Sequence, residues 1–151
     1  MVGASVAYHL ARAEPSLAVC VVERDPRYSR ASAVLSAGGV RQQFSLAPNI
    51  ELSLYGIDFI RNAHVELAVA GENPPDLQLK EQGYLFLASE SGERTLRRNV
   101  ETQRSCGVDW TTLLTPTEIK FRFPWISTEG VALGCFGRNA SLPIDCVSVP
   151  K

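Results

Sequence analysis

A glycine near the start of the chain and a glutamate about 20 residues further on have the spacing of a dinucleotide-recognition site. Gly3 opens a run of small and apolar residues, and Glu23 ends the apolar run LAVCVVE. A helix N-terminus offers backbone N–H groups to phosphates, and glycine lets the backbone approach them closely. An acidic residue at the end of the next strand accepts hydrogen bonds from ribose hydroxyls. The alternative for Glu23 is a solvated glutamate at a strand end.

A row of small side chains follows in the segment SRASAVLSAGGVRQQF, residues 29–44. Small residues let a backbone run close to a bound group, and the pair Gly38-Gly39 permits conformations that other residues avoid. Arg41 comes directly after, and its guanidinium suits a phosphate, a carboxylate or another polar edge. The alternative is a flexible Ser/Gly loop with a solvated arginine.

The elements that would position these residues follow from hydrophobic periodicity. We expect a helix over residues 2–13, ended by Pro15, and a strand over residues 17–23. A continuous β-branched run is typical of a parallel strand that is buried on both faces. A helix followed by such a strand is the second half of a βαβ unit.

Further along the chain, apolar residues at helical spacing predict a helix over 48–70. Strands are expected over 77–79, 84–88 and 130–136, and a polar helix over 91–105 that Gly107 stops. The tetrapeptide TPTE, residues 115–118, predicts a short helix with a capping box, because it combines an N-cap threonine, an N1 proline and an N3 glutamate.

Composition excludes several classes of protein. The 151 residues are 45% hydrophobic and 21% charged, as in a globular chain with a core. A net charge of −1 argues against a nucleic-acid-binding domain. The cysteines have no CxxC spacing, so no metal site is expected, and no apolar run reaches the roughly 18–20 residues of a transmembrane helix.

Three segments together carry a family resemblance: MVGASVAYHLA, the VVERDP turn and SRASAVLSAGGVRQQF. The chain resembles FAD-dependent oxidoreductases of the D-amino-acid oxidase superfamily, within the sarcosine, dimethylglycine and proline dehydrogenase branch. GYLFLAS and KFRFPWISTEGVALG extend the resemblance to about residue 137. It implies an α/β fold: a Rossmann-like FAD-binding parallel sheet, here without its first strand, followed by a mixed α+β segment on the substrate side.

Carried over by motif, the resemblance makes Gly3 the last glycine of the FAD fingerprint and Glu23 the ribose-binding acid, with Arg24 beside it. Ser32 and Ser36 would lie along the flavin pyrophosphate and ribityl chain.

Gly38, Gly39 and Arg41 would approach the isoalloxazine. No catalytic residue is visible, because no general base or nucleophile constellation can be assembled from the sequence.

The implied reaction is FAD-dependent oxidation of a C–N bond in a small N-methyl or secondary amine or amino acid. The resemblance also implies a place on the matrix side of the mitochondrial inner membrane and a role in assembly of respiratory complex I. Complex I subunits or assembly intermediates would then be partners. The alternative is a non-catalytic scaffold or chaperone that keeps the flavoprotein fold as a binding surface.

The family pattern places a β-strand and a GxG before the position of Met1, and several hundred residues after Gly137, where RNASLPIDCVSVPK does not match it. We therefore expect an incomplete chain that is inactive by itself. Its parts are a partial FAD-binding βαβ segment (1–46), a helix and mixed α+β segment (47–137) and an atypical tail (138–151).

Overall fold

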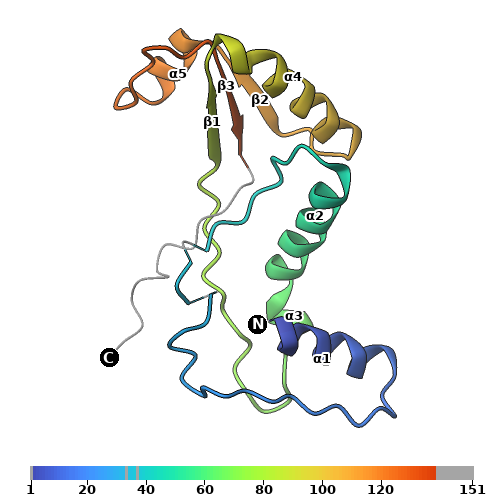
Figure 1. Ribbon diagram of the computed structural model, residues 1–151. Coiled ribbons are helices and arrows are strands. Elements are labelled where there is room, and N and C mark those ends of the chain that lie inside the picture. Colours follow the sequence, from blue (N-terminus) through green and yellow to red (C-terminus); the bar gives the residue numbers. More distant parts are fainter. Residues whose placement is uncertain (1, 33, 37, 139–151) are drawn as a thin grey trace. The chain divides into compact units, whose positions relative to one another are not determined.

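The computed structural model describes residues 2–32, 34–36 and 38–138. These residues divide into two compact units, one that runs to Gly38 and one that begins at Gly39 (Figure 1). The expected tail, residues 138–151, lies outside the described residues except for Arg138. None of the helices in the described part of the chain combines the length and the apolar character needed to cross a bilayer.

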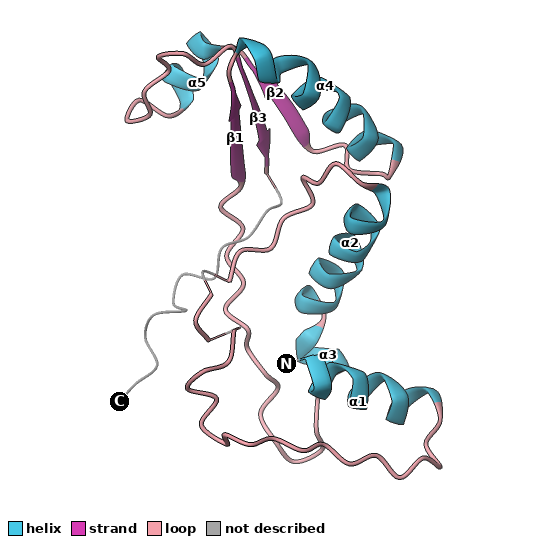
Figure 2. Cartoon of the chain, in the orientation of Figure 1, coloured by secondary structure: helices cyan, strands magenta, loops and turns pink. Residues whose placement is uncertain are grey.

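The first unit begins with α1 (Val2–Ala13), so the predicted helix over 2–13 is confirmed. No residue of α1 is buried, and the apolar side chains that follow are also exposed, with Val22 at 88%. Residues 17–23 are extended but form no strand (Figure 2). The predicted parallel strand is therefore wrong for the described residues. A strand needs a neighbour to pair with its N–H and C=O groups, and this segment has no ladder partner among them.

The second unit contains a three-stranded antiparallel sheet in the order β1-β3-β2 (Figure 1). Its strands are β1 (Tyr84–Ala88), β2 (Thr111–Leu114) and β3 (Leu133–Gly137). Because β3 pairs antiparallel with both neighbours, β1 and β2 run parallel to each other, and α4 (Glu90–Ser105) supplies the crossover that parallel strands require. The fold is mixed α/β with a small antiparallel sheet, and the described residues contain no parallel Rossmann sheet.

One face of this sheet packs against α5 (Pro116–Arg122). The buried cluster there consists of Leu114, Ile119 and Phe136, with Leu85, Phe123, Ile126 and Val131 packed around it. Burying one such side chain fully contributes about 1.5–3 kcal/mol, so this cluster is the main apolar anchor of the unit. The capping box of α5 is confirmed: Glu118 N–H donates to the Thr115 hydroxyl at 3.3 Å, and Thr115 N–H donates to the Glu118 carboxylate at 2.7 Å.

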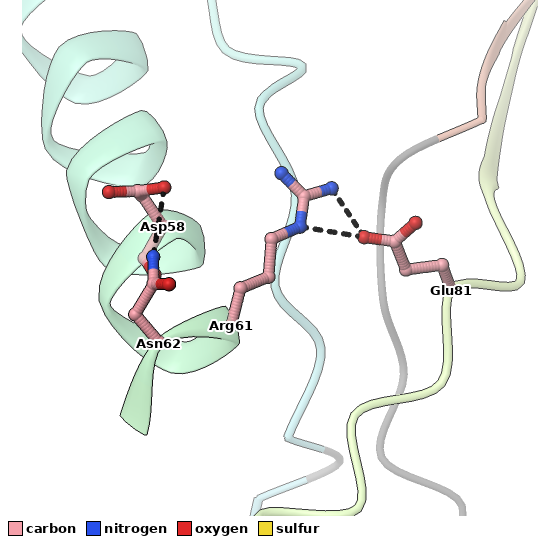
Figure 3. Close-up of polar contacts among 4 residues, drawn as sticks. All are labelled: Asp58, Arg61, Asn62 and Glu81. Atoms are coloured by element: carbon pink, nitrogen blue, oxygen red, sulfur yellow. Dashed lines mark hydrogen bonds and ion pairs between the residues drawn. The ribbon is translucent and has the colours of Figure 1, made fainter. Parts of the chain in front are cut away.

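The long helix expected over 48–70 is two helices, α2 (Ala47–Arg61) and α3 (Ala63–Glu66). They meet at Asn62, whose side-chain amide donates to the Asp58 carbonyl at 2.9 Å and to the Asp58 carboxylate at 3.3 Å (Figure 3). The Asp58 carbonyl also accepts the Asn62 backbone N–H at 3.0 Å, so the helical bond is kept and the break lies in the backbone of Asn62, with φ −95° and ψ 7°. Arg61 pairs with the Glu81 carboxylate and ties the end of α2 to the segment before β1 (Figure 3).

Other expected elements have mixed outcomes. α4 forms close to the predicted range and ends before Gly107, whose φ of 85° gives the left-handed stop. β1 matches the predicted strand 84–88, and β3 overlaps the predicted strand 130–136. The strand expected over 77–79 does not form, because Gln78 has a left-handed φ of 50° that a continuous strand excludes. β2 was not expected from the sequence.

Candidate functional site

The start of α1 can receive an anion. Gly3 lies in its first turn, where backbone N–H groups have no partner within the helix. That turn contains no acidic residue, and a Cβ at Gly3 would meet nothing within 4 Å, so the surface beside these N–H groups is open. A helix of 12 residues has the dipole and the donors that a diphosphate needs. The position therefore fits the pyrophosphate of a dinucleotide.

Glu23 is exposed on an extended segment rather than at the end of a strand. One of its carboxylate oxygens accepts a hydrogen bond from Asp25 N–H at 2.9 Å. The carboxylate has a second oxygen, so an acceptor for ribose hydroxyls remains on this side chain. Arg24 beside it is also exposed. An acceptor of this kind fits the hydroxyl groups of a sugar. The buried strand that was predicted to end at Glu23 is not present among the described residues.

The turn after Glu23 is built by Asp25. Its carboxylate accepts from the Ser29 hydroxyl at 2.7 Å, from Ser29 N–H at 2.9 Å and from Arg27 N–H at 3.1 Å. These hydrogen bonds lower the pKa of Asp25, and the bond from the Ser29 hydroxyl has the largest effect. The carboxylate is therefore ionised at neutral pH and serves the turn.

Of the serines and glycines in the next segment, Ser36 and Gly38 contact each other. Ser32 is exposed in a turn, and Gly39 is exposed. The Ser36 hydroxyl accepts from Gly38 N–H at 3.1 Å, and Gly38 has a left-handed φ of 62°. Gly38 thus adopts a conformation that glycine accepts more readily than other residues. Their contact with a flavin stays a prediction.

Arg41, in the second unit, lies against three aromatic rings. Its guanidinium carbon is 4.9 Å from the ring centroid of Phe44, 5.1 Å from that of Phe86 and 5.3 Å from that of Tyr84. Tyr84 and Phe86 are two apart on β1, so they share one sheet face, and their centroids are 5.2 Å apart. Arg41 also donates to the Tyr84 hydroxyl at 3.5 Å. We call Arg41 with these three rings the Arg41 cage.

The Arg41 cage joins a fixed positive charge to flat apolar surface. Each cation–π contact is worth about 0.5–2 kcal/mol, depending on how far it is desolvated. The Arg41 Nε atom is buried and has no hydrogen-bond partner within the described protein. A guanidinium beside aromatic rings suits a planar group with an electron-rich edge, which fits the polar edge of an isoalloxazine.

Two buried glutamines next to the cage were missed from the sequence. Gln43 is 7% exposed, and its side-chain amide donates to the Cys135 carbonyl at 3.1 Å and the Cys135 sulfur at 3.3 Å. Gln103 on α4 is 3% exposed and donates to the Phe44 carbonyl at 3.1 Å. The sequence signal was the Gln42-Gln43 pair directly after Arg41, because long polar side chains between small and aromatic residues need polar partners when buried.

The thiol in this region is not a nucleophile. Cys135 is buried on β3, and burial raises the pKa of its thiol more than the hydrogen bond from Gln43 lowers it. The thiol is therefore protonated at neutral pH, and only a thiolate attacks efficiently. The chemistry available in this unit is binding and orientation by charge, aromatic surface and buried amides.

Comparison with known proteins identifies the family. Residues 1–142 match the family described as FAD dependent oxidoreductase. FAD-dependent oxidoreductase domain-containing protein 1 of Xenopus laevis is 50% identical over 140 residues, which cover 91% of this chain and 28% of that protein. The Bos taurus protein of the same name is also 50% identical over 140 residues, or 91% of this chain and 29% of its own.

A solved structure supports the same relationship. The L-proline dehydrogenase from P. horikoshii has a TM-score of 0.56 and 26% identity, over 69% of this chain and 26% of its own chain. The chain thus spans little more than a quarter of the curated relatives, 28% and 29%. Since the family match covers more than half of its residues, this chain belongs to the FAD-dependent oxidoreductases.

Proposed function

We propose that this chain contributes to an FAD-dependent oxidoreductase that oxidises a C–N bond of an N-methyl or secondary amino acid. The family match carries the cofactor class. The substrate class is supported by the likeness to an L-proline dehydrogenase, because proline is a secondary amino acid. In the proposed reaction the C–H bond next to nitrogen loses a hydride, and the nitrogen lone pair forms the C=N bond of an iminium product.

The chain's own residues would bind and orient. The N–H groups around Gly3 would hold the pyrophosphate, with Ser32 and Ser36 along the chain that follows it. The Glu23 carboxylate would accept from the ribose hydroxyls, with Arg24 beside it.

Gly38 and Gly39 would let the backbone approach the isoalloxazine, and Arg41 would face its polar edge. When bound, FAD supplies the acceptor for the hydride. The guanidinium of Arg41 would stabilise negative charge that develops on a neighbouring ring.

Anaerobic flavin reduction tests the reaction. Adding sarcosine, dimethylglycine or proline to the FAD-loaded intact oxidoreductase to which this chain contributes should bleach the visible absorbance of oxidised flavin, while an amino acid with a primary amine should not. Loss of bleaching with every N-methyl and secondary amino acid would remove the proposed substrate class.

A matched pair of variants tests the nucleotide end. Glu23→Ala should weaken FAD binding about tenfold or more, because a charged hydrogen bond contributes about 1.5–3 kcal/mol. Glu14→Ala is the control, since Glu14 lies in the same unit and its carboxylate accepts from the Ser16 hydroxyl at 2.6 Å. Equal effects of the two substitutions would refute the role of Glu23.

A second candidate function is a scaffold in complex I assembly, on the matrix side of the mitochondrial inner membrane. It is favoured by two large exposed side chains: Phe121 on α5 is 90% exposed, and Trp125 shortly after α5 is 79% exposed. Exposed aromatic residues of this kind are typical of protein interfaces. Complex I subunits or assembly intermediates would be the partners.

Cells that depend on this protein distinguish the two functions. A Phe121→Ser, Trp125→Ser double variant should lower the amount of assembled complex I if the scaffold acts through this pair. A Glu23→Ala variant with little bound FAD should still support assembly. If assembly follows FAD content and ignores Phe121 and Trp125, the scaffold proposal fails.

A further inference from the structure

A side chain of α4 forms a hydrogen bond with the backbone of the Arg41 cage. Gln103 on that helix donates its side-chain N–H to the Phe44 carbonyl at 3.1 Å. Phe44 supplies the ring that lies nearest to the Arg41 guanidinium, at 4.9 Å. The backbone next to the cage is also tightly turned, because Phe44 N–H donates to the Gln42 carbonyl at 2.9 Å. A buried amide therefore fixes the residue on which Arg41 rests.

Among the described residues, the contacts of Arg41 are weakly directional. Its hydrogen bond to the Tyr84 hydroxyl is long, at 3.5 Å, and contacts with ring faces tolerate lateral movement. The bond from Gln103 is shorter and comes from a side chain that is 3% exposed, so water does not readily replace it. The bond therefore gives Phe44 a directional contact with α4 that the ring contacts of Arg41 do not supply.

We infer that Gln103 is a positioning residue that sets the Arg41 guanidinium against its aromatic rings through the carbonyl of Phe44. The effect of Gln103 on a bound flavin rests on the proposed function, because it requires contact between Arg41 and the flavin. The positioning itself belongs to the protein alone and can be measured without FAD.

Nuclear magnetic resonance of the arginine side chain provides that measurement. The guanidinium carbon of Arg41 lies over three aromatic rings, so the Hε signal of Arg41 should resonate upfield of exposed arginines. Arg41→Lys assigns the signal by removing it. Gln103→Met keeps the length of the side chain and removes its hydrogen bond. This variant should move the Arg41 signal back toward the position of exposed arginines.

Val100→Ala is the matched control, because Val100 is buried on the same helix and forms no part of the cage. It should loosen α4 and leave the Arg41 signal in place. Gln103→Glu, which cannot donate while ionised, gives a second test if Gln103→Met does not fold. An unchanged Arg41 signal in the folded Gln103 variants, or an equal shift in Val100→Ala, would overturn the inference.

A second readout separates this inference from the proposed function. In the FAD-loaded protein, Gln103→Met should shift the visible flavin spectrum as Arg41→Lys does, and Val100→Ala should not. If the Arg41 signal moves in Gln103→Met but neither Gln103→Met nor Arg41→Lys changes the flavin spectrum, Gln103 positions Arg41 and the proposed contact of Arg41 with flavin is refuted.

Discussion

Gly137 on β3 is a position where one added methyl group should disturb the candidate site. Gly137 pairs with Tyr84 on β1 and Thr111 on β2. A Cβ at this position would lie 2.7 Å from the side-chain oxygen of Gln43 and 2.9 Å from its amide carbon. The φ angle of Gly137 lies outside the left-handed region, so the backbone accepts alanine. The nearest conflict in Gly137→Ala is therefore with Gln43.

The expected cost follows from the contacts of Gln43. This side chain is 7% exposed, so it cannot turn into solvent without leaving its site. Overpacking of a filled interior costs about 1–3 kcal/mol. Displacing the amide also weakens its 3.1 Å bond to the Cys135 carbonyl, which contributes about 0.5–1.5 kcal/mol. Gly137→Ala should therefore lower the free energy of unfolding by about 2–4 kcal/mol.

A double-mutant cycle isolates this conflict. Gln43→Ala removes all three of the atoms nearest to the added Cβ. In that background Gly137→Ala should cost almost nothing, so the coupling free energy should approach the whole cost of the single substitution. Urea unfolding followed by circular dichroism gives the free energies and shows from the slopes whether the transitions are comparable.

The control and the refuting result are both specific. Gly56→Ala lies within α2, and its Cβ would meet nothing within 4 Å, so this substitution should stabilise the chain by about 0.5–1 kcal/mol. If Gly137→Ala costs as much in the Gln43→Ala background as in the wild-type chain, the glycine is required for a reason other than room for Gln43. The packing argument would then be wrong.

Three further predictions concern Gly134, Glu118 and the binding of FAD by this chain. Gly134→Ala should destabilise by about 1–3 kcal/mol, because its Cβ would lie 2.7 Å from the Ile119 Cδ1 atom, and Ile119→Val should relieve most of that cost in urea unfolding. Thr115 lowers the pKa of Glu118 through its N–H and then its hydroxyl, so wild type should be more stable than Glu118→Gln at neutral pH. The difference in free energy of unfolding should disappear as the pH falls through the lowered pKa of Glu118. A difference that stays constant with pH in urea unfolding would contradict this. Residues 1–151 alone should bind FAD more weakly than about 1 μM, because the first unit exposes its apolar residues; tighter binding by flavin fluorescence would contradict this.

The elements that the sequence predicted correctly are those whose causes are local. The capping box at Thr115 and Glu118 uses two side chains three residues apart, and the left-handed stop at Gly107 needs one residue type. Both signals sit inside the helix end that they determine. The interruption at Asn62 is also local, but the apolar spacing of a helix continues past it, so the pattern does not mark the break.

Two of the elements that the sequence did not predict correctly, the segment 17–23 and β2, depend on distant partners. Residues 17–23 have the composition of a buried strand, but composition cannot supply the neighbouring strand that a ladder requires. β2 is only four residues long, and its pairing with β3 defines it. A short segment of this kind has no periodicity of its own to reveal it.

The residues of the candidate site also divide into those marked by a local pattern and those that depend on a distant partner. Arg41 was found because a charged residue after two glycines is a local pattern. Gln43 and Gln103 lie 60 positions apart, and each is informative only through its partner: the Cys135 carbonyl for Gln43 and the Phe44 carbonyl for Gln103. A polar side chain with a buried partner is a structural requirement, whereas the same side chain in solvent is neutral. The residues that hold a site in place are therefore harder to predict from sequence than those that would touch its ligand.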